Sequence, residues 1–142
     1  MRHRSSVLRD DEQGSILLLT LGYATLALVA ILVCVSATSL YLAQKRLDSL
    51  ADAAALAGAD GFSLTLVGED VRADLNDDDI REQASEIVDV AGTGALLVSA
   101  STPDGQSARV TVAAVWHPPL VSMFVPEGVR LEATATSRTA LR

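Results

Sequence analysis

A long segment without charged residues constrains this chain more than any other feature. From Gly14 to Gln44 the sequence holds no Asp, Glu, Lys or Arg, and it is rich in Leu, Val, Ala and Ile. Because a helix of about 20 apolar residues crosses the hydrocarbon core of a bilayer, we predict a transmembrane helix over residues 15–43. The hydroxyls within and next to it are expected to hydrogen-bond to their own helix backbone, among them Thr20, Thr38 and Ser39.

This segment is too long for an ordinary signal peptide. The apolar core of a secretory signal has about 7 to 15 residues and is followed by a cleavage site with small residues. An uncleaved anchor is therefore favoured, and a secreted protein released by signal cleavage is the alternative.

The helical pattern continues beyond the apolar segment. No proline or strong turn signal interrupts residues 15–58, and an alanine-rich stretch, KRLDSLADAAALAGADG, follows the span. Spacings of three and four place one set of residues on a single helix face: Leu47, Leu50, Ala51, Ala54 and Gly58. This face is covered either by the chain's own sheet or by neighbouring helices in an assembly. In the second case it is an interaction face, and the long helix offers a route to self-association.

The remainder of the chain predicts one small domain. A short strand is expected at residues 62–67, and a helix at residues 78–90 begins with carboxylates that suit the positive end of its dipole. The sequence period then changes to that of β-strands, which are expected at residues 95–101, 108–116 and 129–139. The predicted fold class is therefore α+β: a long N-terminal transmembrane helix extending into a small domain with one further helix and an antiparallel sheet of about three strands.

Charge sets the expected orientation and excludes some partners. The tail, residues 1–14, holds three arginines, against Lys45 and Arg46 beyond the span. Since Lys and Arg collect on the cytoplasmic side, we expect a cytoplasmic tail (1–14), a transmembrane helix (15–43), its extramembrane continuation (44–61) and an extracytoplasmic domain (62–142). The net charge of −7 comes from residues after Gln44. It opposes binding of nucleic acid or anionic lipid through a basic patch.

No set of residues in the sequence predicts catalysis. The two histidines, His3 and His117, lie in the tail and beside two prolines, and the only cysteine, Cys34, lies in the span. No nucleophile elbow or phosphate-binding glycine loop is present. We therefore expect a protein that is not an enzyme and that holds no cofactor.

Two further segments each allow two interpretations. The run Asp74, Asn76 and Asp78 matches the first ligands of a calcium loop, but the glycine and glutamate that such a loop needs are missing, and helix capping fits better. The loop from residue 116 to 126 is apolar, and it either meets the membrane or a partner, or folds back as a lid on the sheet. Its contact residues would be Trp116, Leu120, Met123 and Phe124.

Two parts of the chain resemble proteins of Tad pilus assembly. Glu12, Gly14 and Ser15 before a long apolar run, followed by QKRLDSLADAAALAGADG, resemble the N-terminal region of proteins of the TadE, TadF and TadG type. A strand ending in VW, a proline-containing loop and the segment VRLEATATSR resemble TadE-like proteins more loosely. The resemblance covers residues 12–61 and, less closely, 106–138.

The resemblance implies a function and a location. It implies a non-enzymatic, single-pass component of Tad/Flp-type pilus assembly or a related secretion apparatus, in the bacterial cytoplasmic membrane, with other proteins of that apparatus as partners. TadE and TadF relatives are pseudopilins cut after a glycine, so Gly14 and Ser15 form the candidate processing site. Leu19 stands where such relatives carry glutamate, so a TadG-like or unprocessed relative fits better. The alternative function is a membrane-anchored extracytoplasmic ligand-binding or sensing module.

Overall fold

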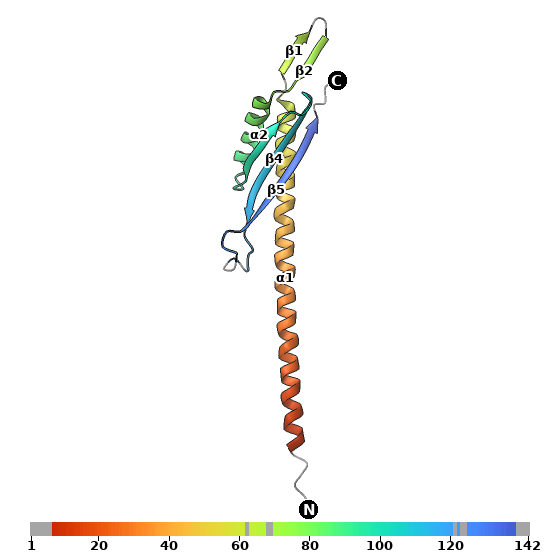
Figure 1. Ribbon diagram of the computed structural model, residues 1–142, viewed down its shortest axis with the longest axis vertical. Helices are drawn as coiled ribbons and strands as arrows, with labels where there is room; N and C mark the ends of the chain where they lie inside the picture. The colour runs from red at the N-terminus through yellow and green to blue at the C-terminus, as the bar shows by residue number, and fades with distance from the viewer. Residues whose placement is uncertain (1–6, 62, 68–69, 121, 123–124, 139–142) are drawn as a thin grey trace, which may run out of the picture. The chain divides into compact units, whose positions relative to one another are not determined.

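The computed structural model describes residues 7–61, 63–67, 70–120, 122 and 125–138. The chain divides into two compact units, Met1–Thr38 and Ser39–Arg142. The first element, α1 (Val7–Asp60), contributes to both units. The other elements belong to the second unit (Figure 1): β1 (Ser63–Val67), β2 (Asp70–Asp74), α2 (Asp77–Ala91), β3 (Leu96–Ser101), β4 (Ser107–Trp116) and β5 (Val129–Arg138). A long apolar helix, one further helix and a three-stranded antiparallel sheet confirm the predicted α+β class.

Helix α1 begins earlier than the sequence predicted. We expected it to start near Ser15, but the helix extends back to Val7. No proline lies between these two positions, so nothing in the polar segment removes a helical hydrogen bond. Leu and Ala, the commonest residues of α1, are also among the best helix formers.

The core of the second unit lies where α1 and α2 meet one face of the sheet (Figure 1). From α1 it takes Leu47 and four alanines, and from α2 it takes Ile80, Ala84 and Val88. The largest fully buried side chains are Ile80, Val110 and Val112. Small residues on α1 let the sheet and α2 approach its backbone closely, so the helix is held by close packing rather than by bulky side chains.

The sheet has the order β3-β4-β5, and both pairs of strands are antiparallel. Val110 in the central strand is opposite Ala100 on one side and Ala135 on the other, so these three buried residues share a face. On the opposite face the hydroxyls of Thr111 and Thr134 lie 2.8 Å apart. One face is therefore core and the other faces solvent, the usual arrangement of an antiparallel sheet covered on one side.

Helix α2 is capped at both ends. The side chain of Asn76, the N-cap residue, accepts a hydrogen bond from the backbone N–H of Asp78 (3.2 Å). Gly92 ends the helix in the left-handed region, with φ of 59°, which glycine adopts without a steric penalty. The helix predicted at residues 78–90 is thus one residue longer at each end.

A second hairpin was not predicted. The sequence indicated one short strand at residues 62–67, and the structure pairs β1 with β2 in an antiparallel two-stranded sheet, with Leu64 opposite Ala73. Strand β2 carries aspartate at both ends and alanine within, residues with low β-propensity. Pairing with β1 therefore outweighs the local preference of this segment.

Candidate functional site

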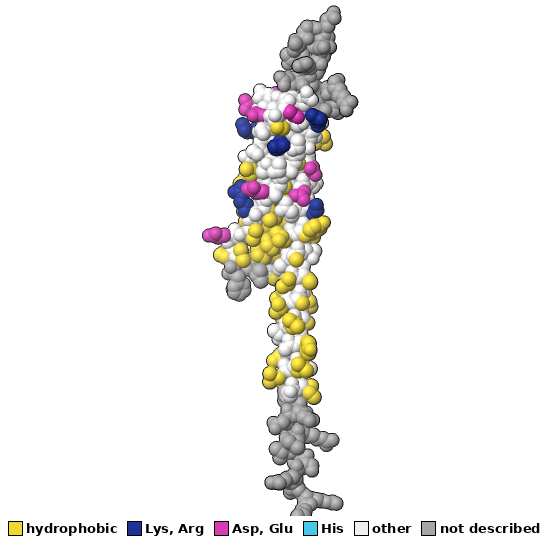
Figure 2. Space-filling view, turned by 45° about the vertical axis from the view of Figure 1, so that its right-hand side comes forward, with side chains coloured by type: hydrophobic (Ala, Val, Ile, Leu, Met, Phe, Trp, Pro, Cys, Tyr) yellow, Lys and Arg dark blue, Asp and Glu magenta, His cyan; other side chains and the backbone are white. Residues whose placement is uncertain are grey.

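Among the described residues, none covers residues 15–31 of α1, the apolar part of this helix in the first unit. Its large side chains are exposed to a degree unusual for a folded chain, as for Leu18 (76%) and Tyr23 (66%). Figure 2 shows hydrophobic side chains along this part of the helix without charged ones among them. Among the described residues, one helix is long and apolar enough to cross a membrane. A bilayer would supply the apolar surroundings that this surface needs.

Three threonine hydroxyls of this segment are satisfied within the helix. Thr20 donates to the carbonyl of Leu17 (2.8 Å), and Thr38 donates to the carbonyl of Cys34 (2.9 Å). Both bonds confirm the expectation from sequence. Because a polar group without a partner is costly in hydrocarbon, internal bonds of this kind suit a helix surrounded by lipid.

Ser39 behaves differently from these threonines. Its oxygen accepts a hydrogen bond from the indole Nε1 of Trp116, at 3.2 Å, rather than donating to its own helix. Five residues further along, the amide of Gln44 donates to the carbonyl of Glu132 in β5 (3.1 Å) and to the carboxylate of Asp48 (2.9 Å). These bonds fasten the end of β4 and the beginning of β5 to residues 39–44 of α1.

The small-residue face of α1 is part of the core. Ala51 and Ala54 are almost completely buried, and Leu47, Leu50 and Gly58 are also buried. A Cβ built on Gly58 would lie 2.8 Å from Cγ2 of Ile80 in α2. Of the two alternatives for this face, the structure shows the first: the chain's own α2 and sheet cover it.

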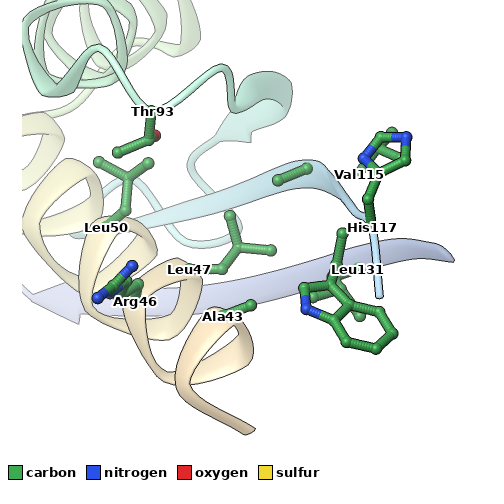
Figure 3. A pocket seen from close by; sticks show the side chains of 10 residues that line it. Ala43, Arg46, Leu47, Leu50, Thr93, Val115, His117 and Leu131 are labelled. Atoms are coloured by element: carbon green, nitrogen blue, oxygen red, sulfur yellow. The ribbon is translucent and has the colours of Figure 1, made fainter. Parts of the chain in front are cut away.

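An open pocket lies next to this face, between α1 and the ends of β4 and β5. Its volume is about 350 Å³, and its lining is mostly apolar. Figure 3 shows Leu47 between Arg46 on one side and His117 on the other, with Leu50 on the same side as Arg46. The lining residues are Ala43, Arg46, Leu47, Leu50, Thr93, Ala114, Val115, Trp116, His117 and Leu131. The pocket was not predicted from the sequence, because its lining residues come from distant parts of the chain.

The pocket opens where the sheet is incomplete. The pairing of β3 with β4 begins at Leu96, opposite Ala113. Residues 114–116 of β4 pair only with β5 among the described strands. The side of β4 that faces away from β5 is therefore uncovered at the pocket.

The predicted contact loop is described only in part. Trp116 is partly buried and donates a hydrogen bond to Ser39, whereas Leu120 is about half exposed (51%). Met123 and Phe124 lie outside the described residues. Of the candidate processing site, Gly14 lies within α1, and Ser15 is exposed.

The acidic segment is used for local structure. Asn76 caps α2, and the carboxylate of Asp77 accepts a hydrogen bond from the backbone N–H of Thr102 (2.6 Å), which joins α2 to the end of β3. Asp78 lies 3.7 Å from Arg81. Within the described part of the chain, no group of three His, Cys, Asp or Glu residues is placed to hold a metal ion.

Asp104 organises the turn between β3 and β4. Its carboxylate accepts hydrogen bonds from the backbone N–H groups of Gln106 (3.0 Å) and Ser107 (2.7 Å) and from the Ser107 hydroxyl (3.0 Å). The bond from Gln106 does most to hold the pKa of Asp104 below its usual value. The bonds from Ser107 and the charge of Arg138 lower this pKa further, whereas desolvation of the carboxylate raises it. Hydrogen bonds to the charged form favour ionisation.

Comparison with known proteins identifies one part of the chain. Residues 14–61 match the family model of the Flp pilus-assembly TadE/G-like proteins, named Tad. This match confirms the resemblance found in the apolar segment and the alanine-rich stretch after it. No curated protein and no solved structure is significantly similar to the chain.

Proposed function

We propose that this protein is a non-enzymatic, single-pass membrane component of Tad/Flp-type pilus assembly or of a related secretion apparatus. Residues 1–14 lie in the cytoplasm in this proposal, residues 15–43 cross the cytoplasmic membrane, and residues 62–142 lie outside it. One observation carries the proposal: the segment that matches the Tad family, residues 14–61, is the helix whose first part is uncovered and apolar. The residues that match the family model thus include the whole candidate span.

The burial of α1 supports a structural role for the second unit. Residues 47–59 of this helix supply much of the core under the sheet. The domain is therefore built on the continuation of its own anchor rather than joined to it by a linker.

Contacts with partner helices are assigned to the apolar segment. The face with Leu47, Ala54 and Gly58 is already occupied by the core. By contrast, residues 15–31 are exposed on all sides in the first unit, and small residues on a transmembrane helix let a second helix approach. Such residues recur there at spacings of three, at Ala24, Ala27 and Ala30.

A deletion strain tests the proposed function. Loss of the protein should abolish surface pili or secretion by the apparatus, and the full chain supplied in trans should restore them. A matched chain in which residues 15–43 are replaced by an unrelated helix of leucine and alanine should reach the membrane and fail to restore assembly. Unchanged pili and secretion in the deletion strain would contradict the proposed function, and full restoration by the replaced helix would contradict the assignment of contacts to this segment.

A further inference from the structure

We draw no further inference here: the strongest candidate, the outer edge of β5, which pairs with no strand other than β4 in the described part of the chain, already has its Glu132 carbonyl bonded to Gln44, and nothing in the structure shows which strand would pair with the rest of that edge.

Discussion

At Gly58 the absence of a side chain decides how closely three elements meet. A Cβ there would lie 2.8 Å from Cγ2 of Ile80 and 3.4 Å from Cβ of Ala108. Because Ile80 and Ala108 are both fully buried, neither can move aside without disturbing the core. Gly58 lies in the last turn of α1, where alanine is the better helix former by up to about 1 kcal/mol, so the close packing must outweigh this loss.

The first prediction concerns this position. Gly58→Ala should lower the free energy of unfolding by about 1 kcal/mol, because the strain of overpacking, about 1–3 kcal/mol, exceeds the gain in helix propensity. Denaturant unfolding of the full chain in detergent, followed by Trp116 fluorescence, measures this change in the free energy of unfolding. Gly22→Ala is the control, since a Cβ at Gly22 meets no atom within 4 Å. A loss of stability at Gly22 equal to that at Gly58 would refute this explanation.

The second prediction follows from the lowered pKa of Asp104. A carboxyl whose pKa is lower in the folded state stabilises the fold above its unfolded pKa of about 3.9 and loses this contribution as the pH falls through the folded pKa. Asp104→Asn should therefore lower stability at neutral pH, and the difference from wild type should shrink below about pH 4. Melting temperatures across pH 2–7 measure this. A difference that stays constant over the whole range would contradict the role of ionised Asp104 in the turn.

Among the elements, α2 depends most visibly on local capping. Its N-cap, Asn76, satisfies the N–H of Asp78, and three aspartates occupy its first turn. The third prediction is that Asn76→Ala lowers the free energy of unfolding by about 1 kcal/mol, the usual value of an N-cap side chain. Melting temperatures of the wild type and of Asn76→Ala, each with and without calcium, distinguish helix capping from ion binding in this segment. Stabilisation of the wild type by calcium that is absent in Asn76→Ala would favour an ion site over capping.

Elements with strong local signals were predictable from the sequence. The uncharged segment, the 3.6-residue pattern after it and the alternation around Val110 each depend on neighbours in the sequence. The pocket and the hydrogen bond between Trp116 and Ser39 do not, because those two residues are 77 positions apart. A face of small residues such as Ala51 and Ala54 likewise predicts close packing without saying what packs there. Strand β2 was missed because its pairing, rather than its composition, makes it a strand.

At the scale of the whole molecule, one helix connects two different environments. In the first unit the side chains of α1 are exposed and apolar, and in the second unit the same helix has a buried face of small residues. The segment that matches the Tad family, residues 14–61, extends through both parts. The proposed function therefore requires a bilayer around the first part and water or partner proteins around the domain.

Cysteine labelling shows whether the first part of α1 lies in a bilayer. The only cysteine of the sequence, Cys34, is exposed in the structure. Protection of its thiol from labelling would therefore come from a bilayer or from a partner protein within the bilayer. In spheroplasts, a membrane-impermeant maleimide should leave Cys34 unlabelled until the membrane is dissolved and the protein denatured. In a Cys34→Ser background, Ser99→Cys on exposed β3 should be labelled at once, and Ser5→Cys only after permeabilisation. Labelling of Cys34 in intact spheroplasts, or of Ser5→Cys and Ser99→Cys from the same side, would contradict a single-pass membrane protein with its domain outside.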